Sequence, residues 1–277
     1  MPYPVRTALL LAFCLGIGAT AARVEAAGDP FGNVAAAYLV KVDGREVWAR
    51  NPSTRLPPGS LAKMMTALLV LERADLRSVV TVSREASRET GSRLGLDAGD
   101  RMLVIDLLAA TLIGSANDAC HVLAEHIAGS ETKFVTLMNA RAREMGLSDT
   151  RFANACGHDA PGMRSTARDL ARLAETAMGN AVFAKMAGLE DGWISTADGG
   201  KKFPLENKNL LIGRYRGAVG VKTGFTGRAG KCLVALAERG GKRVLLVMLN
   251  APDRWWKAEE ILDAAFALGS GASSARP

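Results

Sequence analysis

The sequence predicts an α+β protein, a mixed fold in which an antiparallel sheet is covered by helices. Short apolar segments typical of strands occur near the beginning and near the end of the chain, whereas the long middle part has helical periodicity. Strands from the two ends are able to pair in one sheet, with the helices packed on its faces. The 277 residues, 48% hydrophobic and 23% charged, allow one large or two small domains and exclude disorder, collagen and coiled coil.

The first 26 residues have the layout of a secretory signal peptide. Arg6 provides a positive charge, an apolar run follows over 8–19, and small residues stand at its exit. The apolar run is shorter than a membrane span. We therefore expect a signal peptide at 1–26, a catalytic domain at 27–277, and a soluble, exported protein that is periplasmic or otherwise extracytoplasmic. The Ala/Ser/Gly-rich residues 269–277 are expected to form a flexible tail.

The domain is expected to begin with a β-hairpin at 35–50. Apolar-rich segments flank the Asp43-Gly44 dipeptide, which favours a tight hairpin turn. A Pro-Pro-Gly break follows at 57–59. Apolar residues at helical spacing then predict the first long helix over 61–73.

The middle of the chain is predicted to be helical and the final third to return to strands. Helices are expected at 104–112, 118–128, 132–145 and 166–179, which would form a helical subdomain at about 83–190 inserted into the sheet. Short apolar strands are expected at 219–222, 231–237 and 243–249, and a closing helix at 255–268.

Charge and cysteine content limit the partners and the compartment. Lys and Arg number 35 against 28 Asp and Glu, a net charge of +7 that favours anionic partners. The basic residues are scattered and aromatic residues make up 5%, so we expect no nucleic-acid partner. After the leader Cys120, Cys156 and Cys232 remain, and an exported protein could form one disulfide among them or keep buried free thiols. No spacing typical of a metal or organic cofactor site is present.

Ser60 and Lys63 are a candidate nucleophile and base. Residues three apart share one helix face, so the Lys63 amine would stand one turn from the Ser60 hydroxyl. A neutral amine there could take the hydroxyl proton if burial or nearby positive charge lowers its pKa. Ser130 and Lys133 have the same spacing, but Ser130 is interpreted as a helix cap on a solvated face.

Two further strings contain polar groups suited to a substrate. Ser115 and Asn117 lie between two predicted helices, where a hydroxyl and an amide could pass a proton and hold a carbonyl. Lys222, Thr223 and Gly224 end a predicted strand, where an ammonium and a hydroxyl could hold a carboxylate and the glycine would let a substrate backbone lie close. Taken alone, each string is as readily a helix cap or an ordinary strand end.

The three strings occur in the order S-x-x-K, S-x-N and K-T-G, the signature set of penicillin-binding proteins and serine β-lactamases. The chain resembles the low-molecular-mass penicillin-binding proteins, the D-alanyl-D-alanine carboxypeptidases of the serine peptidase S11 group, over about residues 35–268. Further family-like strings occur at 115–120, 165–169 and 206–211. The resemblance implies a β-lactamase/transpeptidase-like fold. Many members also carry a second β domain, which we do not expect here because the chain ends soon after the catalytic domain.

The resemblance also implies a role for each motif residue. Ser60 would form an acyl-enzyme, with Lys63 as its general base and Ser115 as a proton relay. The oxyanion hole would use the backbone N–H groups of Ser60 and Phe225. Substrate binding would fall to Asn117, Lys222, Thr223, Gly224 and Arg254.

The implied activity is that of a penicillin-sensitive serine D,D-carboxypeptidase, which removes the terminal D-alanine from peptidoglycan stem peptides and is acylated by β-lactam antibiotics. No metal or other cofactor is implied, and no membrane anchor, because the C-terminal end is not amphipathic. A D,D-endopeptidase with the same site is the alternative. A serine β-lactamase is less well supported, since no Glu-x-x-Leu-Asn string occurs between Asn117 and Lys222. Intact motifs argue against a non-catalytic wall-binding protein.

Two positions depart from the family pattern. Phe225 stands where several members carry a histidine, and His158 stands where a leucine is usual. Both lie near the expected site and bear on substrate preference and rate. The sequence leaves open the oligomeric state, the pairing of the cysteines and the physiological role.

Overall fold

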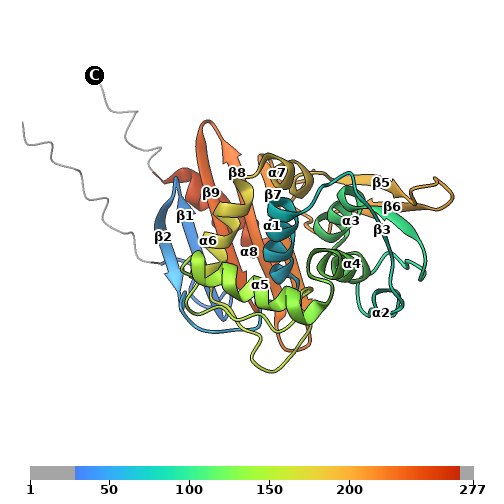
Figure 1. The fold of residues 1–277 in the computed structure, drawn as a ribbon. Coiled ribbons are helices and arrows are strands. Elements are labelled where there is room, and N and C mark those ends of the chain that lie inside the picture. The colour runs from blue at the N-terminus through green and yellow to red at the C-terminus, as the bar shows by residue number, and fades with distance from the viewer. Residues whose placement is uncertain (1–28, 269–277) are drawn as a thin grey trace, which may run out of the picture.

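An antiparallel sheet of five strands organises the residues that the computed structural model describes, 29–268 (Figure 1). Its strand order is β2-β1-β9-β8-β7. The expected hairpin is confirmed as β1 (Ala37–Val42) and β2 (Arg45–Arg50). β1 also pairs with β9 (Lys242–Leu249), so strands from the two ends of the chain meet as predicted.

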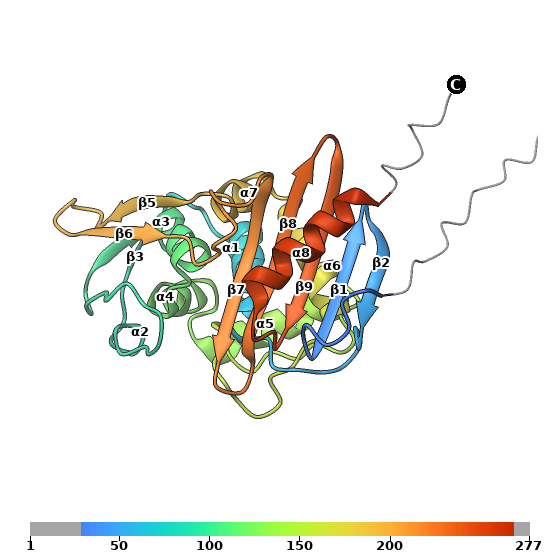
Figure 2. The same ribbon diagram turned by 180° about the vertical axis from the view of Figure 1, so that it is seen from behind.

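The sheet directs alternate side chains into two cores, because successive residues of a strand point to opposite faces. β8 (Gly230–Arg239) lies between β9 and β7 (Ala218–Thr226). On one face Tyr38 belongs to a core closed by α8 (Arg254–Ala267), the helix that crosses the sheet in Figure 2. On the other face Leu39 belongs to a larger core shared with the remaining helices.

Helix α1 (Lys63–Arg73) lies inside the larger core. Its residues from 63 to 70 are all buried, and it packs against α4 (Asn117–Ala128) and α6 (Ala167–Met178). A helix buried on all sides is expected to be apolar all round. Lys63 and Thr66 are the polar residues of this buried stretch, so each needs a hydrogen-bond partner inside the protein.

The segment between β2 and β7 contains α1, α4, α6 and ten further elements. These are η1 (Gly59–Ala62), β3 (Val79–Thr81), α2 (Arg84–Ser87), β4 (Arg101–Leu103), α3 (Val104–Ala109), η2 (Ala110–Gly114), α5 (Glu131–Glu144), α7 (Ala181–Ala187), β5 (Asp191–Ser195) and β6 (Lys202–Glu206). Helices dominate this segment, as expected, but the short strands β3 and β4 pair within it as well.

The long elements match their predictions and the short ones were not predicted. The helices expected at 61–73, 104–112, 118–128, 132–145 and 166–179 are present, with ends that differ by a few residues. β3 and β4 have three residues each, too few for a periodic pattern, and α2 and α7 have four and seven. The β5–β6 hairpin is largely exposed, so it lacks the apolar alternation of a half-buried strand.

Two of the expectations concern the ends of the chain. The predicted signal peptide at 1–26 and the predicted tail at 269–277 lie outside the described residues. None of the helices within 29–268 has the length and apolar character needed to cross a membrane.

Truncation of a side chain in the central helix should destabilise the whole domain. Leu69 of α1 is fully buried, so we expect Leu69→Ala to lower the free energy of unfolding by about 2 to 5 kcal/mol through lost burial and the cavity left behind. Urea denaturation followed by circular dichroism measures this change. Leu189→Ala is the control, because Leu189 is 39% exposed. An equal loss in both variants would contradict the central position of α1.

Candidate active site

The turn before α1 places Ser60 at a cleft with Lys63 behind it. Residues 59–62 form a 3-10 turn, and α1 begins at Lys63. Side chains three residues apart lie above one another in such a turn. Nζ of Lys63 is 3.0 Å from Oγ of Ser60, the separation expected for a nucleophile and its base.

Lys63 is fully buried, and the oxygens around its amine are uncharged. Nζ lies 2.6 Å from Oδ1 of Asn117 and 2.6 Å from the carbonyl oxygen of Cys156. A neutral amine can donate its two protons to these oxygens and keep its lone pair for the Ser60 hydroxyl. Burial and, next, the charge of Lys222 lower the pKa of Lys63 well below its ordinary value.

Ser115 and Asn117 stand at the junction between η2 and α4. Ser115 has a left-handed backbone conformation, with φ 59°, and it lines the cleft. Asn117 accepts from Lys63 through Oδ1, and its Nδ2 donates to the carbonyl oxygen of Thr90 over 2.6 Å. The amide expected to bind substrate therefore also holds the lysine in place.

The end of β7 forms another wall of the cleft. Lys222 is buried, and burial together with the charges of Arg254 and Lys208 lowers its pKa to about 7. Thr223 and Gly224 follow Lys222 and line the cleft directly. The end of β7 thus provides a hydroxyl in the cleft wall and a buried amine next to it in the chain, groups that suit a carboxylate ligand.

Gly224 allows β7 to lie against the nucleophile turn. A methyl group at Gly224 would lie 2.9 Å from the carbonyl oxygen of Pro58 and 3.2 Å from the backbone nitrogen of Ser60. Gly157 approaches the same turn from another segment, since a methyl group there would lie 2.0 Å from the carbonyl oxygen of Gly59. The sequence predicted Gly224 to make room for a substrate, and in the structure it also makes room for the turn that carries Ser60.

The two backbone amides expected to form an oxyanion hole lie on adjoining segments. A methyl group at Gly59 would lie 3.3 Å from the backbone nitrogen of Phe225. A methyl group at Gly224 would lie 3.2 Å from the backbone nitrogen of Ser60. Donors on neighbouring segments can point to one oxygen of a bound substrate. The Phe225 side chain is 64% exposed and gives the cleft an apolar border.

Arg254 begins α8 and reaches the same wall. Its Nη1 donates to the carbonyl oxygens of Gly224 at 2.8 Å and Cys232 at 3.0 Å. Its Nε is buried and has no hydrogen-bond partner among the described residues. The guanidinium therefore braces the end of β7 and adds positive charge near Lys222.

The predicted residues come together around one cleft of about 470 Å³. Those that line it are Ser60, Ser115, Thr223, Gly224, Phe225 and Arg254, whereas Lys63, Asn117 and Lys222 are buried beside them. Ser92, Lys208 and Trp255 also line the cleft, and sequence reasoning assigned none of them a role. The family-like string at 206–211 was the signal that could have pointed to Lys208.

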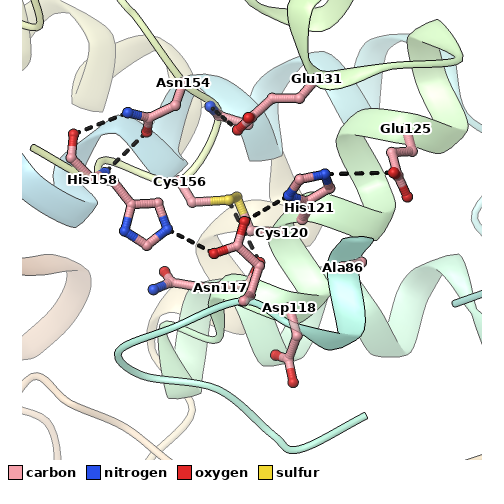
Figure 3. Close-up of polar contacts among 12 residues, drawn as sticks. Ala86, Asn117, Asp118, Cys120, His121, Glu125, Glu131, Asn154, Cys156 and His158 are labelled. Carbon is pink, nitrogen blue, oxygen red and sulfur yellow. Dashed lines mark hydrogen bonds and ion pairs between the residues drawn. A yellow bond between two sulfur atoms is a disulfide. The ribbon is translucent and has the colours of Figure 1, made fainter. Parts of the chain in front are cut away.

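A disulfide joins Cys120 of α4 to Cys156 (Figure 3). Because the carbonyl oxygen of Cys156 contacts Lys63, the bond ties the loop that holds the base to α4. Cys232 is free and buried within the described part of the chain. Of the cysteine states left open by the sequence, the structure therefore has one disulfide and one buried thiol.

Comparisons with known proteins identify the family of the chain. The family model for D-alanyl-D-alanine carboxypeptidases, peptidase S11, matches residues 24–253. D-alanyl-D-alanine carboxypeptidase DacF of Bacillus subtilis is 37% identical over 239 residues, which are 83% of this chain and 61% of that protein. DacB2 of Mycobacterium tuberculosis is 34% identical over 264 residues, 91% of this chain and 90% of that protein.

The solved structures and further relatives extend the comparison. The crystal structure of the Streptomyces K15 DD-transpeptidase superposes with a TM-score of 0.80 at 30% identity, covering 85% of this chain and 98% of that one. Relatives named D-alanyl-D-alanine endopeptidase match at 30% identity in Pseudomonas aeruginosa and 29% in Escherichia coli. The predicted transpeptidase-like fold is thereby confirmed. The chain belongs to the S11 family of D-alanyl-D-alanine carboxypeptidases.

Proposed function

We propose that this chain is a penicillin-sensitive serine D,D-carboxypeptidase that releases the terminal D-alanine of peptidoglycan stem peptides. The observation that carries the proposal is the buried Lys63 amine, which lies 3.0 Å from Oγ of Ser60 while two other oxygens take its protons. A hydroxyl beside a neutral amine is an activated nucleophile. The names of the relatives supply the substrate class, a peptide that ends in D-alanyl-D-alanine.

In the proposed acylation, Oγ of Ser60 attacks the carbonyl carbon of the bond between the two D-alanines, and Lys63 takes the hydroxyl proton. The charge that develops on the carbonyl oxygen would be stabilised by the backbone N–H groups of Ser60 and Phe225. Lys222 as an ammonium and the hydroxyl of Thr223 would bind the terminal carboxylate. This binding places the scissile bond over Ser60.

The leaving D-alanine needs a proton when its C–N bond breaks. Ser115 lines the cleft and would relay that proton from Lys63 to the amine. Asn117 would hold Lys63 and bind the substrate amide, and Arg254 would brace Gly224 and add positive charge for the carboxylate. Water then attacks the ester and gives a proton to Lys63, which returns it to Oγ of Ser60 as the ester bond breaks. The shortened peptide leaves with a new terminal carboxyl group.

A β-lactam offers a strained acyl bond next to a carboxylate, so we propose that it acylates the same serine. We further propose that residues 1–26 direct export and that 27–277 act on peptidoglycan outside the cytoplasm, with a helical subdomain inserted at about 83–190. The net charge of +7 suits an anionic wall polymer.

A D,D-endopeptidase is the second candidate, because two of the relatives carry that name. Acylation at Ser60 would be the same in both reactions. The difference lies in the leaving group, which is free D-alanine in one reaction and the side-chain amine of a neighbouring peptide in the other. The cleft must then admit a second peptide beside Phe225.

Replacement of the nucleophile should abolish covalent labelling. We expect Ser60→Ala to lose all labelling by a fluorescent penicillin and all release of D-alanine, because within residues 29–268 the only hydroxyl hydrogen-bonded to the Lys63 amine is that of Ser60. Gel fluorescence and an enzymatic D-alanine assay measure the two outcomes. Ser130→Ala is the matched control, since Ser130 has the same spacing to a lysine but caps α5. Labelling of folded Ser60→Ala at the wild-type level would refute the acyl-enzyme.

The pH profile of kcat/KM should be bell-shaped. Lys63 must lose its proton to act as a base, so kcat/KM should rise with pH as Lys63 deprotonates. Because the pKa of Lys63 is lowered, this rise forms the acid limb of the profile. Lys222, with a pKa of about 7, must keep its proton to hold the carboxylate, so kcat/KM should fall as the pH rises above about 7. Lys222→Arg keeps its charge and should move the basic limb to higher pH. A basic limb that stays in place in this variant would exclude Lys222 as its source.

The choice of leaving group can be measured directly. We expect D-alanine release from a stem pentapeptide to exceed cleavage of a cross-linked dimer, assayed side by side by chromatography and mass spectrometry. Ser60→Ala serves as the blank for both substrates. Cleavage of the dimer alone would replace the carboxypeptidase by the endopeptidase.

A further inference from the structure

Glu89 bridges two histidines close to the active site. It follows α2, and its side chain is 13% exposed. Its Oε1 lies 2.6 Å from Nδ1 of His121, and its Oε2 lies 2.9 Å from Nε2 of His158. Both carboxylate oxygens are therefore engaged, each by an imidazole from a different part of the chain.

The two histidines come from the segments that the disulfide joins. His121 follows Cys120 in α4, and His158 stands two residues after Cys156. Figure 3 shows the two imidazoles on either side of the disulfide. Glu89 thus ties its own segment to α4 and to the loop between α5 and α6, two segments that the disulfide also joins.

The segments that Glu89 connects also contact Lys63 or Asn117. Thr90, next to Glu89, accepts the hydrogen bond from Nδ2 of Asn117. Cys156 accepts from Nζ of Lys63, and Asn117 accepts from the same nitrogen. The Glu89 bridge therefore closes a ring of contacts around the amine, with Thr90 on one side and Cys156 on the other.

The bridge is charged rather than neutral. Burial alone disfavours the carboxylate, but the hydrogen bonds from the two histidines outweigh it and hold the pKa of Glu89 well below its ordinary range. The hydrogen bond to Glu89 raises the pKa of His121 against the effect of burial, and Glu131 and Glu125 add to that rise. Nε2 of His121 faces Oε1 of Glu125 at 3.5 Å, an arrangement that suits an imidazolium.

We propose that Glu89 is a positioning residue for the reaction, which fixes the Lys63 amine against Ser60 by bridging His121 and His158. The inference rests on the proposed acyl-enzyme chemistry and adds a residue that none of the signature motifs contains. Small displacements of a catalytic group are costly, since a shift of about 1 Å can reduce a rate about 100-fold. Glu89 also acts on Lys63 by its charge, which opposes the effects of burial and of Lys222 on the pKa of Lys63, as does Asp118.

Glu89→Gln tests both effects, because it keeps the shape and removes the charge. We expect the second-order rate of acylation by a fluorescent penicillin to fall on the order of tenfold at its plateau. The acid limb of the pH profile, measured from about pH 5 to pH 9, should move to lower pH because Lys63 loses a nearby negative charge. Glu89→Asp should restore the position of that limb, since it restores the charge. A thermal melt of each variant reports on folding.

Glu125→Gln is the matched control, because Glu125 faces His121 but contacts neither Thr90 nor the loop of His158. Its rate and pH profile should equal those of the wild type. If folded Glu89→Gln has the wild-type rate and an unmoved acid limb, the positioning role is wrong while the proposed function stands. If the wild type itself is not labelled, the proposed function fails.

A second pair of variants applies if Glu89→Gln does not fold. His158→Gln removes one arm of the bridge at a residue whose side chain is 34% exposed, and it leaves the Glu89 charge in place. We expect its plateau rate to fall several-fold with the acid limb unmoved. His126→Gln, at the exposed histidine of α4, should leave both unchanged. Equal rates in the two histidine variants would overturn the proposal.

Discussion

A buried lysine amine, proposed to act as a neutral base, is the constraint on which the rest of the site depends. Removal of an unpaired ammonium from water costs several kcal/mol. The closest polar groups around Nζ of Lys63 are a hydroxyl, an amide oxygen and a backbone carbonyl, all of them uncharged. Such acceptors satisfy the N–H groups but stabilise an extra proton less than a carboxylate would. A carboxylate in the place of the Asn117 amide would raise the pKa of the lysine and weaken it as a base.

The cleft wall formed by the end of β7 is positively charged, and this charge also affects the pKa of Lys63. Lys222 and Arg254 concentrate positive charge at the end of β7, where a substrate carboxylate is expected to bind. Lys222 also lowers the pKa of Lys63, so the group proposed to recognise the substrate helps to keep the base unprotonated. Both effects require close approach of separate segments, which Gly157 and Gly224 permit because neither has a side chain to collide with the Ser60 turn.

Much of this arrangement could be predicted from the sequence, because it is encoded in short segments. The hairpin around Asp43, the long helices and the strands of the last third follow from local periodicity and turn residues. The motif residues could be named because three short strings occur together in the order of a known signature set. What could not be predicted are contacts between segments far apart in the chain, such as Glu89 between two histidines and Arg254 against Gly224. The exposed β5–β6 hairpin was missed because it buries too little to impose a pattern.

The disulfide between Cys120 and Cys156 has a consequence for the unfolded chain as well as for the site. It closes a loop over a sequence separation of 36 residues. In the chain-entropy view, such a cross-link removes conformational freedom from the unfolded ensemble equivalent to about 4 kcal/mol, a large share of the stability of an ordinary domain. Protein disulfides persist in oxidising compartments and are rare where thiols are kept reduced. The same chain is therefore a more stable molecule in an oxidising environment than in a reducing one, and one end of the cross-link is the residue whose carbonyl oxygen contacts Lys63.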